Sequence, residues 1–471
     1  MFTRDEAIAL AERALSMSAM QKFGIAISHR VTAVTKIVGG RRIQCVDSDQ
    51  LNLGFPSEIG SKIQISVETN VRDAEMLRQV IRTAGLHKTP LPNAEDQKPD
   101  DPDDPYHSFD RPQHYLPVTL WHDSTIEAMS TARGETIANM ADTMRNGDGR
   151  DRQLTMAGSV AVTSNVYLMY FPGGRIAWGE ATDSEVTASV RARDGRASGW
   201  SGQTNRDWSQ IQPERVVQEA IDMANRSRGP VRMEPGRHTA ILSPVAVGQL
   251  VRHMSSNFAA VRNRAGGGPF SHVGAPNGRN LRLGERVFDE RITMFTDPND
   301  PLGGDFPFFT DGTPSGRQSW IEGGVLQALS YDPYDALKYG KTAIRDPESV
   351  HVMAAPGAKT ATVAEMIANC ERGFYVNRFS NLIEVDQNST GLIGSTRDGC
   401  FYIKDGKINS PVVNFRIFES PFLMFNRIMA VGTSERVAFG FGDVHGWPLR
   451  PIIVPPLMVR DFNFSGMSDA V

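Results

Sequence analysis

The stretch that decides the fold is DGTPSGRQSWIEGGVLQ, which runs from Asp311 to Gln327. Its Asp-Gly and Gly-Gly pairs predict turns, because glycine adopts positive φ angles without a steric penalty. The EGG of residues 322–324 therefore marks a hairpin. Two other stretches carry the same kind of signal. They are GERVF (284–288) leading to ITMFTDP (292–298), and IKDGKI (403–408) followed by PV (411–412) and VGT (431–433).

A strand-rich domain is expected around these stretches, over residues 230–471. A strand is predicted at 239–242, and Ser243-Pro244 starts a helix whose apolar face extends as far as Val261. Thr362 and Glu365 cap one further helix. Few helices and many short strands predict a domain dominated by a large antiparallel sheet.

An α/β domain is expected before it, over residues 1–229, with Gly229-Pro230 as the boundary. Thr3 and Glu6 form a capping box for the first helix, and Gly39-Gly40 joins two strands. A long helix is predicted over 124–144, again with a capping box, and strands over 153–170 and 176–192. The expected fold class is therefore α+β.

An exposed acidic loop is expected from about residue 88 to residue 117. Its run PDDPDDP (99–105) combines proline with like charges, which oppose both helix and sheet. The loop lacks the ligand spacing of an EF-hand, so a solvated excursion is preferred over a calcium site.

The bulk composition excludes several functions. The chain has 471 residues, with 50 basic and 54 acidic side chains and a net charge of -4, so no basic surface for nucleic acid is indicated. The three cysteines form no paired motif, which fits a reducing compartment. Neither a secretory signal nor a run of about 18 apolar residues occurs. We expect a cytoplasmic protein that contacts no membrane.

Standard catalytic motifs do not occur in the sequence. There is no GxxxxGK[ST], no GxGxxG at a strand-to-helix turn, no GxSxG and no HExxH. His445 lies in the glycine-framed turn GDVHGW (442–447), which could present an imidazole at a cleft. A surface histidine without a function is the plainer interpretation.

The three hairpin-bearing stretches, in this order and spacing, resemble the TldD/PmbA family, also called the TldD/TldE or microcin-processing metallopeptidases. Residues 311–327 look like that family's DEGVP-T-R…LIENGVL hairpin, and YIKDGKINSPV (402–412) looks like its IENGKI-PV hairpin. The resemblance covers most of residues 239–455 and is weaker before them.

The resemblance implies a two-subunit peptidase. In that family the TldD subunit carries an HExxxH helix, and a later cysteine helps hold zinc. The TldE/PmbA subunit lacks the motif and pairs with TldD. Substrates resembling the family's are unfolded or flexible peptides, held extended in an enclosed chamber.

The present chain departs from the zinc motif at each ligand position. The matching stretch is Arg252-His253-Met254-Ser255-Ser256-Asn257, so an arginine and an asparagine stand in place of the two histidines. A permanently charged guanidinium repels zinc and a neutral amide binds it poorly. No cysteine follows Cys400 either. The chain therefore resembles the TldE/PmbA half, with no zinc and no catalytic residue of its own.

Six residues remain as candidates for a substrate groove: Arg252, His253, Asn257, Asp311, Arg317 and His445. In the alternative interpretation, the first three are simply the polar side of a packed helix. Asp311 and Arg317 would then form a salt bridge within a hairpin. We expect a TldD-like zinc-bearing partner in a heterodimer, or a self-dimer, and a peptide substrate. A stand-alone peptidase or amidase using His253 or His445, and a non-catalytic peptide-binding scaffold, are the alternatives.

Overall fold

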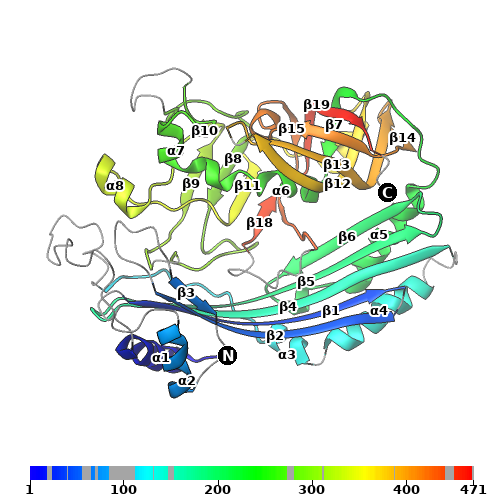
Figure 1. Ribbon diagram of the computed structural model, residues 1–471. Helices are drawn as coiled ribbons and strands as arrows, with labels where there is room; N and C mark the ends of the chain where they lie inside the picture. Colours follow the sequence, from blue (N-terminus) through cyan, green and yellow to red (C-terminus); the bar gives the residue numbers. More distant parts are fainter. Residues whose placement is uncertain are drawn as a thin grey trace.

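The protein has an N-terminal half built on one long twisted sheet and a C-terminal half built on two smaller sheets. In Figure 1 the long strands cross the lower half of the view, and the C-terminal half lies above them. The computed structural model describes residues 1–17, 24–39, 41–55, 65–68, 73–83, 112–130, 132–146, 153–272, 281–309, 312–386, 388–440 and 450–468.

The N-terminal sheet has the order β3-β2-β1-β4-β5-β6, and each pair of neighbours is antiparallel. The predicted glycine turn between β1 and β2 is present, with a positive φ angle at Gly39, and Gly195 has a positive φ angle in the turn between β5 and β6. The strands are β1 (Ile25–Val38), β2 (Arg41–Phe55), β3 (Ile65–Glu68), β4 (Leu154–Tyr170), β5 (Ile176–Ala192) and β6 (Ser198–Asn205).

Helices cover one face of this sheet (Figure 1). The helix predicted over 124–144 is present as two helices. Its predicted capping box is wrong, because the Ser124 hydroxyl donates to Asp207 rather than capping its own helix. The helical elements are α1 (Arg4–Met17), α2 (Ala74–Thr83), α3 (Asp123–Ser130), α4 (Ala132–Asn146), the 3₁₀ turn η3 (Trp208–Gln210) and α5 (Pro213–Arg226).

The second face of the N-terminal sheet lies against the C-terminal half. Phe306 and Phe308 of the C-terminal half pack with Tyr167 and Met169 of β4. Because both of its faces are covered there, β4 is buried at every position from Val160 to Met169 instead of at alternate ones. Residues 88–111 of the predicted acidic loop lie outside the described residues, and residues 112–122 have no regular secondary structure.

The C-terminal half confirms the α+β class. It holds two sheets instead of one, and each contains one parallel pairing, β11 with β18 and β12 with β7. The first sheet has the order β10-β9-β8-β11-β18-β17. Its strands are β8 (Ile292–Thr296), β9 (Gln318–Glu322), β10 (Val325–Leu326), β11 (Val350–Ala354), β17 (Glu435–Arg436) and β18 (Ile452–Val454).

The second sheet closes on itself. Strand β12 pairs with β7, β7 with β19, β19 with β15, β15 with β13, and β13 again with β12. The rings of Phe374, Phe415 and Phe464 pack together at centroid distances of 4.9–5.2 Å. The strands are β7 (Gly236–Leu242), β12 (Arg372–Asp386), β13 (Gly391–Lys404), β14 (Lys407–Pro411), β15 (Phe415–Glu419), β16 (Ile428–Val431) and β19 (Leu457–Met467).

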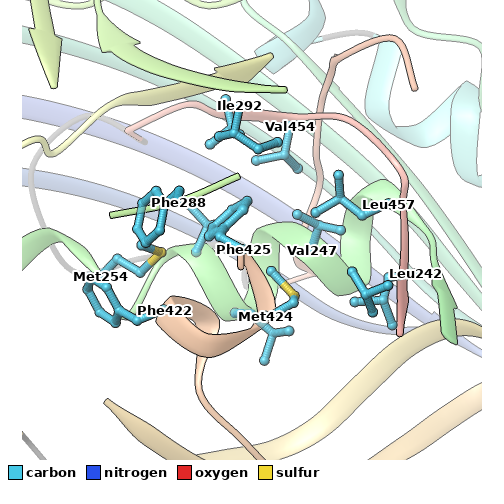
Figure 2. Packing of buried hydrophobic residues seen from close by; sticks show 14 of the residues in the cluster. Leu242, Val247, Met254, Phe288, Ile292, Phe422, Met424, Phe425, Val454 and Leu457 are labelled. Carbon is cyan, nitrogen blue, oxygen red and sulfur yellow. The ribbon is translucent and has the colours of Figure 1, made fainter. Parts of the chain in front are cut away.

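Helix α6 (Pro244–Val251) lies between these two sheets and contacts β7, β12 and β18. Figure 2 shows Val247 of this helix between Leu242 and Leu457 of one sheet and Val454 of the other. A Cβ atom added at Gly248 would lie 2.7 Å from a methyl carbon of Val437, so glycine allows the close approach. The remaining elements are η4 (Ser255–Phe258), α7 (Ala260–Arg264), α8 (Pro333–Tyr339), α9 (Val363–Ala368) and α10 (Pro421–Met424).

The prediction of one continuous helix from Ser243 to Val261 is wrong. The α-helix ends at Val251, and a turn, the 3₁₀ segment η4 and the short α7 follow it. Met254 and Phe258 remain buried, whereas Val261 is exposed. Among the described residues, no helix has the length and apolarity needed to cross a membrane.

Candidate functional site

The end of α6 and the turn after it carry Arg252, His253 and Asn257, which the sequence resemblance predicts to stand at the positions of a zinc motif. Ser243 begins the helix, because its hydroxyl oxygen accepts a hydrogen bond from the Ala246 N–H at 3.1 Å. The same hydroxyl donates to the carbonyl of Asn377 on β12. The helix is therefore attached to the closed sheet at its start, and it ends where Arg252 occupies the C-cap.

Arg252 and His253 lie at the surface of this segment. The Arg252 guanidinium carbon is 5.4 Å from the ring centroid of Phe439, a cation–π distance. Burial lowers the pKa of the His253 imidazole, and the positive charge of Arg252 lowers it further. His253 is therefore a neutral, half-buried imidazole at pH 7.

Asn257 lies in the core. Its side chain is fully buried, and its amide nitrogen donates to the Thr390 hydroxyl at 2.6 Å. The backbone carbonyl of Asn257 accepts a bond of 2.7 Å from the Asn263 side chain. These contacts connect η4, α7 and the turn before β13. Asn257 thus links packed segments and does not face a chamber.

The donor set at the end of α6 does not fit a zinc ion of the family's kind. A guanidinium, one imidazole and an amide that is already hydrogen-bonded do not supply the three or so ligands that a catalytic zinc needs. Burial raises the pKa of the Cys400 thiol to about 12 and also raises that of Cys370, so neither is a ready thiolate. Within the described ranges, no group of three or more His, Cys, Asp or Glu side chains is placed to hold a metal.

Arg317 occupies a different place, at a cavity of about 380 Å³ whose lining residues, between Thr296 and Ser349, all belong to the C-terminal half. Its guanidinium carbon is 4.1 Å from the ring centroid of Phe295, and its Nη1 is 3.1 Å from Asp297 Oδ2. The salt bridge of Arg317 is thus with Asp297, while Asp311 and His445 lie outside the described residues. Arg252, His253 and Asn257 do not line this cavity, so the structure does not bring the described candidates together.

Aromatic and charged side chains both line the cavity. The aromatic ones are Phe306, Phe308, Phe309 and Trp320. Four carboxylates and two guanidinium groups also line it, which leaves two negative charges in excess. These ionisable residues are Asp297, Asp305, Asp346, Glu348, Arg317 and Arg345.

A network of buried charges joins the two halves next to this cavity. Asp183 of β5 bonds with Arg436 of β17, and Arg206 Nη1 is 3.7 Å from the same carboxylate oxygen. Arg206 also donates to the carbonyls of Gly303 at 2.7 Å and Gly304 at 2.8 Å. Burial, followed by repulsion from Arg436, lowers the pKa of Arg206 to about 10.

The charge network and the cavity were not predicted from the sequence. Asp183, Arg206 and Arg436 are far apart along the chain and belong to no motif, so their contacts depend on the packing of the two halves. The sequence offered one signal for the charge network: two acidic residues, Asp183 and Glu185, lie within a strand whose other residues are mostly apolar or small.

A second cavity, of about 510 Å³, lies where the chain passes from the first half to the second. Arg196, Arg232 and the buried Asp398 are among its lining residues. Asp398 is flanked by two further guanidinium groups, with Arg378 Nε at 3.6 Å and Arg397 Nε at 4.0 Å. These four guanidinium groups outnumber the single carboxylate, so the surroundings of this cavity carry an excess of positive charge.

Solved structures of other proteins share this fold. The fold is shared with a solved structure of a putative modulator of DNA gyrase from Bacteroides thetaiotaomicron, with a TM-score of 0.76 and 17% identity over 99% of this chain and 100% of that chain. It is also shared with the crystal structure of TldE from Thermococcus kodakarensis, with a TM-score of 0.74 and 16% identity over 98% and 100%.

Sequence comparison identifies the family. Residues 235–466 match the PmbA/TldA metallopeptidase C-terminal domain. A metalloprotease of Methanothermobacter thermautotrophicus is 26% identical over 170 residues, which are 34% of this chain and 37% of that protein. The chain is a member of the TldD/PmbA family, and so a metallopeptidase-like protein.

Proposed function

We propose that this chain is the TldE/PmbA-like subunit of a TldD/TldE-type metallopeptidase that processes unfolded or flexible peptides in the cytoplasm. The observation that supports the proposal is the donor set at the end of α6. There, a family member carries a guanidinium stacked on Phe439 and an amide bonded to Thr390, where the family's zinc ligands would stand. Such a chain contributes a fold and a binding surface rather than a metal.

A TldD-like partner bearing HExxxH supplies the zinc in this proposal. The zinc would polarise the peptide carbonyl and activate water in the partner, while the present chain helps to enclose and orient the peptide. The solved structure called TldE shares this fold, which supports the choice of half. A heterodimer is the expected assembly.

The test is zinc content by elemental analysis, on the chain alone and co-purified with a TldD-like chain carrying HExxxH. The expected result is no zinc in the chain alone and about one zinc per pair, with cleavage of an unfolded peptide only by the pair. Stoichiometric zinc or peptide cleavage by the chain alone would overturn the proposal in favour of a stand-alone peptidase or amidase. Failure of the two chains to associate would favour a peptide-binding scaffold.

A further inference from the structure

The cavity beside Arg317 has an aromatic ring in its lining that is available to a ligand. Phe306 and Phe308 are buried against the N-terminal sheet, with ring centroids 5.5 Å apart. Phe309, next in the chain, lines the same cavity but is only half-buried. The face of an aromatic ring attracts a cation within about 6 Å of its centroid.

Glu348, a carboxylate of this cavity, is repelled by the carboxylates of Asp305 and Asp346. The pKa of Glu348 is raised, first by burial and then, against the opposing effect of Arg450, by the charges of Asp305 and Asp346. Burial also raises the pKa of Asp346. The effect on Glu348 places it near Asp305 and Asp346, and all three side chains line the cavity.

Two of these carboxylates accept hydrogen bonds from serine hydroxyls, and each also lies near a guanidinium group, Asp305 near Arg206 and Asp346 near Arg345. Asp305 accepts a hydrogen bond from Ser349, and Asp346 accepts one from Ser330. Glu348 pairs with Arg450 at 2.7 Å. Asp305 also accepts a hydrogen bond of 2.8 Å from the Phe306 N–H. Because a carboxylate offers about four acceptor positions, these bonds leave Asp305 and Asp346 with acceptor capacity for a further donor.

The rim of the cavity already holds one cation by this chemistry. Arg317 lies 4.1 Å from the Phe295 ring and 3.1 Å from Asp297, so a guanidinium is held between an aromatic ring and a carboxylate. The interior offers the same two elements, Phe309 and the carboxylates, to a second cation.

We propose that this cavity binds one cationic group of a peptide, a lysine or arginine side chain or an N-terminal ammonium, between the Phe309 ring and the carboxylates of Asp305, Asp346 and Glu348. The volume of about 380 Å³ admits a side chain with its adjoining backbone and excludes a folded segment. The inference rests on the proposed function only in taking the cation to be part of a peptide. It gives the substrate class as basic, flexible peptides.

The test is isothermal titration calorimetry of the full chain, without partner or zinc. The ligands are acetylated and amidated Gly-Ala-Lys-Ala-Gly and its arginine, norleucine and glutamate counterparts, together with the norleucine peptide left with a free amino terminus. The lysine or arginine peptide is expected to bind at least about tenfold more tightly than the capped norleucine peptide. Binding by the uncapped norleucine peptide alone would identify the ammonium terminus as the ligand.

Substitutions then locate the binding to the cavity. Asp346→Asn, Glu348→Gln and Phe309→Leu are each expected to weaken the cationic peptide about five- to tenfold. Glu371→Gln, which removes an exposed carboxylate that does not line the cavity, is expected to change it less than twofold. Thermal melts establish that each variant is folded.

Equal affinity for the lysine and norleucine peptides, no binding by any cationic peptide, or equal weakening by Glu371→Gln would overturn the inference. None of these outcomes bears on zinc content or on cleavage by the pair. A failed titration and a failed subunit assignment are therefore distinguishable.

Discussion

Asn257, which the sequence resemblance predicts to stand in place of a metal ligand, is part of the core of this chain. Its side-chain amide donates a hydrogen bond to Thr390, which is also fully buried, and its backbone carbonyl accepts one from the Asn263 side chain. A hydrogen bond inside the protein gains little net free energy, but a buried group that loses its partner costs about 1–3 kcal/mol.

Asn257→Ala is therefore expected to lower the free energy of unfolding by about 1–3 kcal/mol, because the Thr390 hydroxyl loses its partner and a small void forms. Urea denaturation measures the change. Ser256→Ala is the matched control: the neighbouring residue is exposed, so an effect below about 0.5 kcal/mol is expected. Equal effects of the two substitutions would contradict a structural role for Asn257.

The lowered pKa of His253 should make the stability of the chain depend on pH. Its pKa is lowered in the folded chain, so between that pKa and the ordinary value of about 6.5 the unfolded chain binds more protons than the folded chain. The contribution of His253 to the free energy of unfolding is thus complete above pH 6.5. It is lost as the pH falls from 6.5 through the lowered pKa of the folded chain. His253→Gln is expected to make the fall in unfolding free energy between pH 7 and pH 5 less steep.

Arg252→Gln supplies the control for this titration. Because burial is the larger cause and the Arg252 charge the smaller one, the variant is expected to recover only part of the shift in the His253 pKa. An NMR titration of the imidazole C–H signal measures it directly. A midpoint at or above 6.5 in the parent chain would show that burial does not control this group.

The residue identities at the end of α6 were readable from the sequence, but their surroundings were not. Arginine and asparagine in place of histidines exclude the family's zinc ligands by their chemistry alone. Whether such a residue faces solvent or the core depends on contacts with distant segments, as the bond between Asn257 and Thr390 shows. The same limit applies to the interior cavity, whose walls come from separate segments of the chain.

At the scale of elements, local signals were the dependable ones. The capping boxes of Thr3 with Glu6 and of Thr362 with Glu365 are confirmed, because each depends on four consecutive residues. The break after Val251 was not predictable. Met254 and Phe258 stay buried through a 3₁₀ turn, so the apolar periodicity continues where the α-helix does not.

The cap of α6 gives a prediction at this scale. Ser243→Ala is expected to lower the free energy of unfolding by about 1–3 kcal/mol, because it removes both the cap of Ala246 and the bond to the buried Asn377 carbonyl. Ser243→Thr keeps the hydroxyl and should recover most of the loss. Chemical denaturation of the two variants checks this, and an equal loss in both would count against the hydroxyl.

At the scale of the whole molecule, the charges buried between the halves are the feature to test. Arg436→Met leaves the buried Asp183 without its nearest partner and is expected to destabilise the chain by about 3 kcal/mol or more. The double variant with Asp183→Leu should lose much less than the sum of the two single losses. Additive losses in this cycle would mean that the pair does not couple the halves.

An exposed pair provides the comparison. Arg286 and Glu290 are 2.7 Å apart, with side chains 56% and 71% exposed, so Arg286→Met is expected to change stability by less than about 1 kcal/mol. Calorimetric melting of both arginine variants separates a buried contact between the halves from an ordinary surface ion pair.

The closed ring of strands has a consequence for synthesis. Strand β7 is made from residues 236–242, but one of its neighbours in the ring is β19, residues 457–467. A nascent chain can complete the N-terminal sheet early, whereas the ring cannot close until β19 has left the ribosome. A product truncated before Leu457 would keep β7 and β15 without the strand that joins them, with open edges that favour aggregation.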